Sequence, residues 1–320
     1  MSVKNILYKS VFIVICLAIT VTLCLKTETR TRFKMGTFVD IVLTGFVWND
    51  FGPVFDSAFL AIDSVEQIAD MYDTGSQLSN LNRSACVGPF HADKELFAMI
   101  YHSDRLNRES DGVFDITIAP VAKLWKLCIH NKIMPDAKDI RDNLVLTGPG
   151  NLALNPESQE VFFKKKGMSI DLGAVAKGYA VDKAVSQIKI SGIKSAMINA
   201  GGDIFCLGKK NLFSPWRVGI RDPYDKKNIC EVISLSDKAA ATSGGYEQFF
   251  MYEGKCYSHL IDPRTGYPSN GEYSSVTVIA DSCFLADSLA TAIFIGGEET
   301  RKKLLSLYPG IEVITIKSNF

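Results

Sequence analysis

Asp287 and Thr291 stand four positions apart in a segment that the apolar pattern predicts to be helical, over about 282–295. Residues at this spacing lie on the same face of a helix, so their side-chain oxygens point the same way. A ligand set made only of oxygen suits a hard cation such as magnesium, which leaves other coordination positions to water and substrate phosphate. An Asp and a Thr at this spacing are also common on solvated helix faces. The pair therefore predicts a cation site only together with other segments.

A second segment, Asp171 to Asp182, reads DLGAVAKGYAVD. Asp171 ends a predicted strand, Gly173 permits a close backbone approach, and Lys177 falls in the first turn of the helix that follows. The amino end of a helix favours anions. The segment therefore predicts a phosphate site, although it is neither a Walker A loop nor a G-x-G-x-x-G fingerprint. The alternative is a structural turn with a lysine that extends to solvent.

The third segment is a dense polar block, Tyr257 to Pro268, with the sequence YSHLIDPRTGYP. It carries His259 among Pro and Gly residues, as a rigid loop at a site would. A histidine there could deprotonate a hydroxyl nucleophile or orient a carboxylate, or it could only brace the loop. A fourth segment, Asp111 to Pro120, is followed by Trp125. Its aromatic residue could edge a flat heterocycle, but core packing explains that residue equally well.

The remaining chain supplies the elements that must hold these segments. Apolar patterns predict strands near 38–43, 168–171, 196–199, 216–220, 231–235, 275–280 and 311–316. They predict helices over 55–72, 93–108, from Gly173 onward, over 282–295 with Asp281 as N-cap, and over 298–308. Strands and helices do not alternate as in a doubly wound sheet, so the fold class is α+β.

Composition narrows the classes of function. The 320 residues are 47% hydrophobic and carry 35 basic and 35 acidic side chains. Without a basic run, the chain has no footprint for a phosphate backbone, and nucleic acid is excluded as a partner. The eight cysteines include no C-x-x-C pair, which argues against a zinc site, and their spacing assigns no disulfide.

The N-terminal segment differs from the rest of the chain. Lys4 and Lys9 precede an uncharged stretch over 10–25, which is typical of an export signal. No small-x-small cleavage pattern follows Leu25, which favours a retained anchor, and lipidation at Cys24 is the competing hypothesis. We expect residues 1–30 to form a signal or membrane anchor. The rest of the chain would then face the periplasm or the exterior of a bacterial inner membrane.

Taken in order, these segments resemble the FAD:protein FMN transferase family, the ApbE-type flavin transferases. The resemblance runs from about residue 35 to the C-terminus and implies one transferase domain over 31–320. One segment, Ser243 to Gln248, departs from the family pattern at Gly245 and Gln248. The matching segments are 35–37, 72–82, 112–115, 171–182, 199–203, 216–220, 242–246, 258–266 and 286–291.

The resemblance also implies a fold and a set of site residues. The fold would be an α+β, mixed-sheet ApbE-like domain with FAD in a cleft between two packed α/β lobes. Magnesium would be held by the Ala174 carbonyl, Asp287 and Thr291, and His259 and Asp287 would be catalytic. FAD would contact Met35, Tyr72, Val113, Phe114, Asp115, Asp171, Lys177 and Ile261.

The implied reaction is a phosphoryl-type transfer that makes the chain an enzyme. A threonine or serine hydroxyl of an acceptor protein attacks the FMN-side phosphorus of FAD, and AMP leaves. Mg²⁺ and Lys177 would stabilise the charge that builds on the phosphate oxygens. Two alternatives stay open. Water could replace the hydroxyl, giving an FAD pyrophosphatase, or the chain could be an exported FAD-binding protein without activity.

Overall fold

The computed structural model describes residues 24–211, 213–225, 227–245, 249–252, 255–269 and 271–318. The strands are β1 (Leu25–Lys34), β2 (Thr37–Phe46), β3 (Phe90–His91), β4 (Leu152–Asn155), β5 (Glu160–Phe163), β6 (Ser195–Ala200), β7 (Asp203–Leu207), β8 (Trp216–Arg221), β9 (Ile229–Leu235), β10 (Lys238–Gly244), β11 (Phe249–Tyr252), β12 (Lys255–Ser258), β13 (Ile261–Asp262), β14 (Tyr267–Pro268), β15 (Tyr273–Ala280) and β16 (Glu312–Lys317). The helices are α2 (Gly52–Ala69), α3 (Gln77–Arg83), α4 (Lys94–Glu109), α5 (Ala119–His130), α6 (Ala137–Leu144), α7 (Ala176–Ile190) and α8 (Cys283–Leu307), with the 3-10 turns η1 (Ile116–Ile118) and η2 (Pro149–Asn151).

A seven-stranded sheet organises the domain, in the order β1-β2-β6-β7-β10-β15-β16. Each pair of neighbours in this order is antiparallel. The predicted α+β class is confirmed, although the main sheet is purely antiparallel where a mixed sheet was expected. Tight turns such as the one between β1 and β2 join sequential strands directly, and such hairpins enforce antiparallel pairing.

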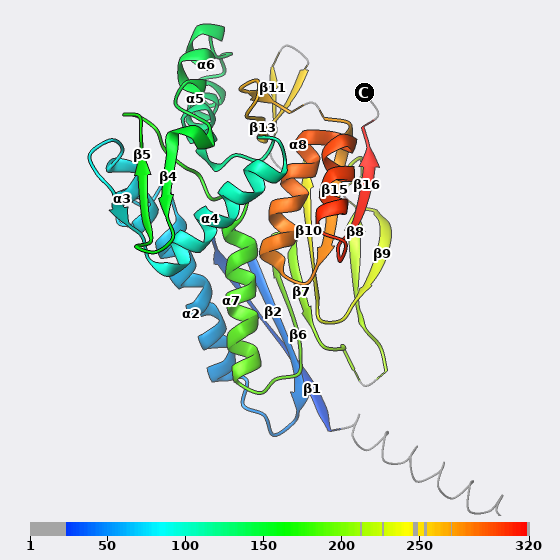
Figure 1. Ribbon diagram of the computed structural model, residues 1–320. Helices are drawn as coiled ribbons and strands as arrows, with labels where there is room; N and C mark the ends of the chain where they lie inside the picture. The colour runs from blue at the N-terminus through cyan, green and yellow to red at the C-terminus, as the bar shows by residue number, and fades with distance from the viewer. Residues whose placement is uncertain are drawn as a thin grey trace, which may run out of the picture.

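Alternation along the strands gives the sheet two apolar faces. In β2, Ile41 and Leu43 point into the large core, while Val42 between them packs on the opposite side. The large core lies under α2, α7 and α8, which run side by side over one face of the sheet (Figure 1). The hairpin β8–β9 covers the other face with Trp216, Val218 and Ile233. Burial on both faces explains why these strands are so rich in apolar residues.

A smaller cluster lies beside the main core, where α5 and α6 form a separate pair of helices (Figure 1). It joins Val121 and Trp125 of α5 to Ile140 of α6 and Ile261 of β13. The indole of Trp125 is 2% exposed, and its Nε1–H donates to the Gly266 carbonyl at 2.7 Å. Trp125 therefore fixes the loop of the polar block against α5, and its role is packing.

Three local predictions differ from the structure. Residues 168–171 form no strand, because Asn82 and Ile116 take the backbone groups that a neighbouring strand would need. The next helix begins at Ala176, after a turn at 173–175. Ser282, and not Asp281, is the N-cap of α8, since its hydroxyl accepts from the Leu285 amide. The two predicted C-terminal helices form one element, α8, with a kink at Gly297.

Residues 1–23, which make up most of the predicted anchor, lie outside the described residues. Its expected boundary at residue 30 falls inside β1, which pairs in register with β2 from Leu25 onward. Residues 25–30 therefore belong to the sheet. Among the described residues, no helix combines the length and the apolar character that a membrane span requires.

Gly178 sets how closely α7 approaches the start of α8. A Cβ at this position would lie 2.5 Å from the Cys283 carbonyl oxygen and 2.9 Å from the Phe284 Cα, which are both backbone atoms. Real Cβ atoms do not approach backbone so closely, so any side chain here forces the two helices apart.

We expect Gly178→Ala to lower the free energy of unfolding by about 1–3 kcal/mol, the usual cost of overpacking. Gly150→Ala is the matched control, because a Cβ there would meet nothing within 4 Å and the backbone φ is not positive. Urea denaturation followed by circular dichroism measures both. Equal stability of the two variants would contradict the close approach of α7 and α8.

Candidate active site

The site forms where the start of α7 meets α8 and the sheet. Lys177, in the first turn of α7, lies with its Nζ 2.8 Å from Asp203 Oδ2 and 3.5 Å from Asp287 Oδ2. Asp203 is the first residue of β7, and Asp287 belongs to the second turn of α8. Both aspartates are almost fully buried, at 3% and 4% exposure. Three elements distant in sequence thus bring one ammonium and two carboxylates together.

The electrostatics of this triad leave an excess of negative charge. Burial alone would lower the pKa of Lys177, but the Asp203 and Asp287 carboxylates outweigh it, so the pKa is raised and the side chain stays an ammonium. Burial and the nearby Asp203 carboxylate raise the pKa of Asp287 above its usual range, although Lys177 opposes the shift. A raised pKa means that an added positive charge, a proton or a cation, stabilises this carboxylate.

The first turn of α7 leaves an amide that Asp287 can reach. α7 begins at Ala176, so the amide of Gly178, its third residue, has no acceptor within the helix. This amide donates to Asp287 Oδ2 at 3.1 Å. The first bond within the helix runs from the Tyr179 amide to the Val175 carbonyl, so Ala174 lies before it. Within the described part of the chain, the Ala174 carbonyl accepts no backbone hydrogen bond. This carbonyl therefore stays a candidate ligand, four residues before Gly178, whose amide contacts Asp287.

Thr291 lies one turn after Asp287 on α8, and both side chains are buried. Its hydroxyl is 3.1 Å from the hydroxyl of Ser243 on β10. The two predicted helix ligands thus face the sheet and not solvent, which removes the solvated-face alternative. Ser243, which the sequence did not single out, orients the Thr291 hydroxyl.

The predicted ligand set of Ala174, Asp287 and Thr291 fits a hard cation in composition. All donors are oxygens, and the buried carboxylates outnumber the ammonium two to one. Among the described residues there is no cluster of three or more His, Cys, Asp or Glu side chains that could hold a metal. A site here would therefore rely on one carboxylate together with carbonyl, hydroxyl, water and phosphate oxygens, as magnesium sites do.

Asp182 ties α7 to the amino end of α8 and so fixes Asp287 relative to Lys177. Its two carboxylate oxygens accept from the amides of Cys283 and Phe284 at 2.8 and 2.9 Å. Because these amides are unpaired in the first turn of a helix, the carboxylate acts as a second N-cap supplied by another helix. Burial nevertheless raises the pKa of Asp182 to about 6.

Two further predicted residues, Asp115 and Asp171, come from neighbouring segments that the structure joins. The Asp171 amide donates to the Ile116 carbonyl at 2.8 Å. Asp115 Oδ1 accepts from the Thr117 amide at 2.7 Å, and Asp171 Oδ1 accepts from the Gly173 amide at 2.8 Å. Burial raises the pKa of both carboxyl groups.

Tyr72 and Asp171 both interact with Lys126 of α5. The Lys126 ammonium lies 3.8 Å from the centre of the Tyr72 ring, and its charge, with that of Lys123, favours the Asp171 carboxylate. Tyr72 is 62% exposed, so this aromatic face is open to solvent. Met35 forms the β1–β2 turn with a positive φ of 51°, and its amide donates to Glu66 Oε1 at 2.6 Å.

Three residues predicted to contact FAD are buried in the protein. Val113 and Phe114 are each 2% exposed and belong to the main core, and Ile261 lies in the smaller cluster beside α5. Their contacts to FAD stay a prediction. Because the side chains are buried, such contacts would be made by their backbone atoms and by the adjoining turns.

His259 is exposed and follows directly after β12. A Cβ on Gly245 would lie 3.4 Å from Phe294 of α8 and 3.8 Å from Ser258. The end of β10, the His259 loop and α8 therefore adjoin one another. Gln248 lies outside the described residues.

Sequence reasoning missed Asp203, Ser243 and Lys126 as site residues. Asp203 ends the Asn199–Asp203 segment, which matched the family pattern without a role for its carboxylate. An Asp after a double glycine reads as turn chemistry, and only the sheet shows that it points back at α7. Ser243 and Lys126 carry no local signal.

The chain matches a known protein family over most of its length. The ApbE family matches residues 35–315. The chain is 32% identical to an FAD:protein FMN transferase of Klebsiella pneumoniae over 262 residues, which cover 82% of this chain and 81% of that protein. It is also 32% identical to an FAD:protein FMN transferase of Treponema pallidum, over 82% of this chain and 76% of that one.

Solved structures agree with the sequence relatives. The flavin transferase ApbE from Vibrio cholerae superposes with a TM-score of 0.82 at 27% identity, covering 92% of this chain and 95% of that one. The ApbE protein from Thermotoga maritima gives 0.83 at 29% identity, covering 91% and 94%. The chain belongs to the ApbE family, whose curated members compared above are named as transferases that act on FAD.

The contact of Asp182 with the amino end of α8 predicts how the free energy of unfolding depends on pH. Folding raises the Asp182 pKa from 3.8 to about 6, so the native state binds a proton more tightly than the unfolded state. This proton-linked stability is complete below pH 4 and is lost as pH rises to about 6. Relative to Asp182→Asn, the wild type should therefore lose on the order of 2 kcal/mol of unfolding free energy over this range.

Urea denaturation at several pH values measures this difference. Asp142→Asn, at an exposed position of α6, is the control, and its unfolding free energy should differ from that of wild type by the same amount at every pH. The same pH-independent difference for Asp182→Asn would show that Asp182 is not buried as a cap.

Proposed function

We propose that this chain transfers the FMN half of FAD to a threonine or serine hydroxyl of an acceptor protein, with release of AMP, and that the reaction requires Mg²⁺. Family membership supports the transferase activity and FAD as substrate. One structural observation supports the rest of the proposal. Lys177 and Asp287 meet at the amino end of α7, where a diphosphate would be bound and where the Ala174 carbonyl accepts no backbone hydrogen bond from the described residues.

The positive charge at this end of α7 is suited to phosphate. The helix dipole and the Lys177 ammonium both favour an anion there. Because Lys177 forms ion pairs with Asp203 and Asp287, its ammonium is fixed in position before substrate binds. A fixed charge needs no reorganisation as negative charge develops in the transition state, which is the main source of electrostatic catalysis.

A divalent cation would complete the charge balance of the site. Ala174, Asp287 and Thr291 would hold Mg²⁺, which when bound would neutralise phosphate oxygens and stabilise the leaving group. Ser243 orients the Thr291 hydroxyl so that a lone pair can face the ion. Asp203 is the nearer partner of Lys177, and Asp287 contacts Lys177 and the Gly178 amide through Oδ2, so its Oδ1 would face the cation.

His259 is the proposed proton acceptor for the attacking hydroxyl. It is exposed, as a residue that must meet a protein acceptor has to be, and its loop is held by the hydrogen bond from Trp125 to the Gly266 carbonyl. Tyr72 offers an exposed aromatic face near Asp171 and Lys126, which suits stacking on a ring of FAD. FAD would span from this face to the amino end of α7.

The N-terminal segment supports a proposal about the cellular location of the reaction. Its basic residues followed by an uncharged stretch over 10–25 predict export and a retained anchor or a lipid attached at Cys24. We therefore propose that the domain faces the periplasm or the cell exterior, next to the membrane.

Asp287→Ala should abolish FMN transfer while the fold is retained. The variant removes the only carboxylate of the proposed cation site, so the rate should fall by on the order of 1000-fold or more. Asp281→Ala is the matched control, because this aspartate lies just before α8 and is exposed. AMP release and an FMN-sized mass increment on the acceptor measure the outcome. Normal turnover of Asp287→Ala with Mg²⁺ present would remove the metal assignment.

Thr291→Val should raise the Mg²⁺ concentration needed for half-maximal activity by about tenfold, because it removes one oxygen ligand and keeps the side-chain shape. The control is Thr277→Val, which also removes a buried hydroxyl paired with another hydroxyl, that of Thr242 at 2.8 Å. A Mg²⁺ titration of AMP release compares them. An equal shift in both variants would mean that the effect is general destabilisation.

One assay separates transfer from the two alternatives. The enzyme is incubated with FAD, Mg²⁺ and an acceptor protein, and both AMP and acceptor mass are followed. Transfer gives AMP together with an FMN-sized increment. AMP with free FMN and an unmodified acceptor would indicate a pyrophosphatase, and a stable yellow protein without AMP would indicate a binding protein.

A further inference from the structure

One end of the domain, which we call the basal face, carries features that the proposed reaction does not use. It consists of Leu25 at the start of β1 and the loops 44–50, 191–195 and 209–213, apart from Leu212, which lies outside the described residues. In Figure 1 this end lies at the carboxyl end of α7, opposite the α5–α6 pair.

Exposed apolar side chains gather in the β2–α2 loop of the basal face. Phe46, Val47 and Trp48 follow one another and are 37%, 51% and 68% exposed. The Phe46 and Trp48 rings stack with centroids 4.6 Å apart and an interplanar angle of 4°. The loop also closes on the start of the domain, since the Val47 amide donates to the Cys24 carbonyl at 2.8 Å. Phe213 adds a further ring that is 73% exposed. Adjacent exposed aromatics of this kind mark an interaction surface.

Basic side chains line the same hollow as Phe46. Lys194, Lys209 and Lys210 are exposed, and none of them has an ion-pair partner within the part of the chain that is described. The only acidic residue in the basal loops defined above is Asp50, whose Oδ1 accepts from the Gly52 amide at the start of α2. The basal face is thus locally cationic although the whole chain is neutral.

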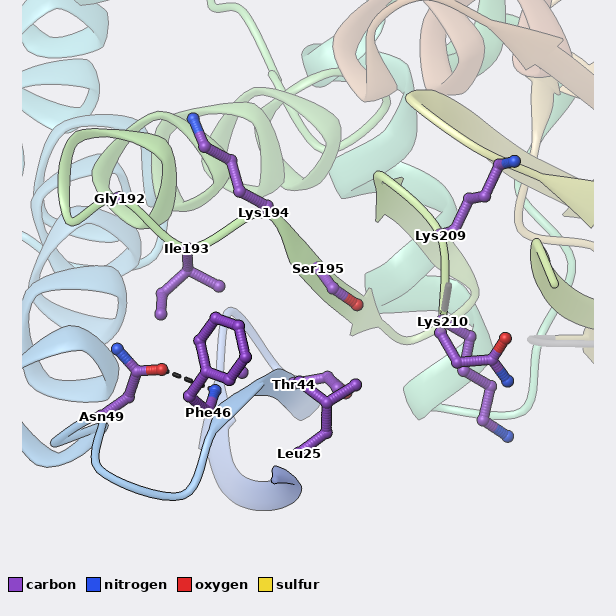
Figure 2. Close-up of a pocket in the computed structure, with 12 residues that line it drawn as sticks. Leu25, Thr44, Phe46, Asn49, Gly192, Ile193, Lys194, Ser195, Lys209 and Lys210 are labelled. Atoms are coloured by element: carbon purple, nitrogen blue, oxygen red, sulfur yellow. Dashed lines mark hydrogen bonds between the residues drawn. The ribbon is translucent and has the colours of Figure 1, made fainter. Parts of the chain in front are cut away.

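A hollow of about 400 Å³ lies between these groups, lined by Leu25, Phe46, Ile193 and Lys194 among others. Figure 2 shows the Phe46 ring turned toward Ile193, while the amino groups of Lys194, Lys209 and Lys210 extend away from one another. Three ammonium groups that diverge cannot converge on one small anion. They suit an extended anionic surface instead.

The point at which the chain enters the domain identifies that surface. Residues 1–23, with the uncharged stretch that predicts a membrane anchor, are joined to the domain through Cys24 and Leu25, at the basal face. Trp and other aromatics lie at the headgroup level of membranes, and lysines next to an anchor are attracted to anionic lipid. We propose that the basal face lies against the headgroup region of an anionic lipid bilayer. This inference rests on the proposed membrane anchoring and not on the proposed chemistry.

The orientation has a consequence for the reaction. The site lies at the amino end of α7 and the basal face at its carboxyl end, and a 15-residue helix is about 22 Å long. A basal face on the membrane would therefore hold the site roughly 20 Å above the bilayer, directed away from it. An acceptor domain could then approach without contact with lipid.

Trp48 is a natural reporter for this contact. The chain has three tryptophans, and Trp125 and Trp216 are only 2% and 4% exposed. The experiment uses the full chain mixed with vesicles of zwitterionic lipid, or of zwitterionic lipid with 30 mol% (about one third) phosphatidylserine, each with or without brominated acyl chains. Flotation reports attachment, and quenching by bromine reports the depth of Trp48.

On anionic vesicles we expect the full chain to float, and we expect its tryptophan emission to shift to the blue and to be quenched by bromine near the acyl carboxyl end. Trp48→Phe should remove the quenchable signal. Lys194→Gln with Lys209→Gln and Lys210→Gln should weaken the quenching, since each lysine near an anionic surface contributes about fivefold in binding. The matched control is Lys132→Gln with Lys138→Gln and Lys166→Gln, three exposed lysines near α5 and α6, which should leave the quenching unchanged.

Three outcomes would overturn the proposal. They are a chain that does not float, a floating chain in which Trp48 stays as accessible to aqueous iodide as without vesicles, and equal effects of the two lysine triples. Protection of Trp48 only when a membrane protein is added would assign the basal face to a protein partner. FMN transfer measured in detergent is independent of these results, so a failure of the proposed chemistry remains distinguishable.

Discussion

The contact between α7 and the amino end of α8 is the constraint on which the site depends. Gly178 lets the two helices approach until the Asp287 carboxylate accepts a hydrogen bond from the Gly178 amide. Asp182, one turn further along α7, caps α8 and fixes its position along α7. Lys177 lies within ion-pair distance of Asp203 and Asp287 in this arrangement. The packing of α7 against α8 thus brings one ammonium and two carboxylates together.

The antiparallel sheet makes this contact possible. Its strands bury apolar residues on both faces, and the packing of α7 and α8 on one face fixes their positions relative to β7 and β10. Asp203 of β7 forms an ion pair with Lys177, and Ser243 of β10 forms a hydrogen bond with Thr291. Residues on a rigid scaffold keep catalytic distances better than residues on loops. His259 and Tyr72, in contrast, belong to connecting segments and are exposed to solvent.

The buried charges carry an energetic cost for folding. Two nearly buried carboxylates share a single ammonium, and a buried, imperfectly balanced charge is unfavourable for folding. The divalent cation that we propose for this site would offset the excess negative charge. The family to which the chain belongs uses FAD, whose diphosphate would bring further negative charge to such a cation.

The α+β class, most strands and helices, and the segments that meet at the candidate site were predictable from the sequence, because apolar periodicity and turn residues are local signals. The sequence singled out Lys177, Asp287 and Thr291, whose spacing on their helices is also local. It could not show that 168–171 lacks a strand partner, that Ser282 caps α8, or that Val113, Phe114 and Ile261 are buried. Nor could it assign Asp203 and Ser243, which are brought to the site by strand neighbours distant in the chain. These features became visible in the folded domain, since burial and pairing depend on contacts between residues that are far apart in the sequence.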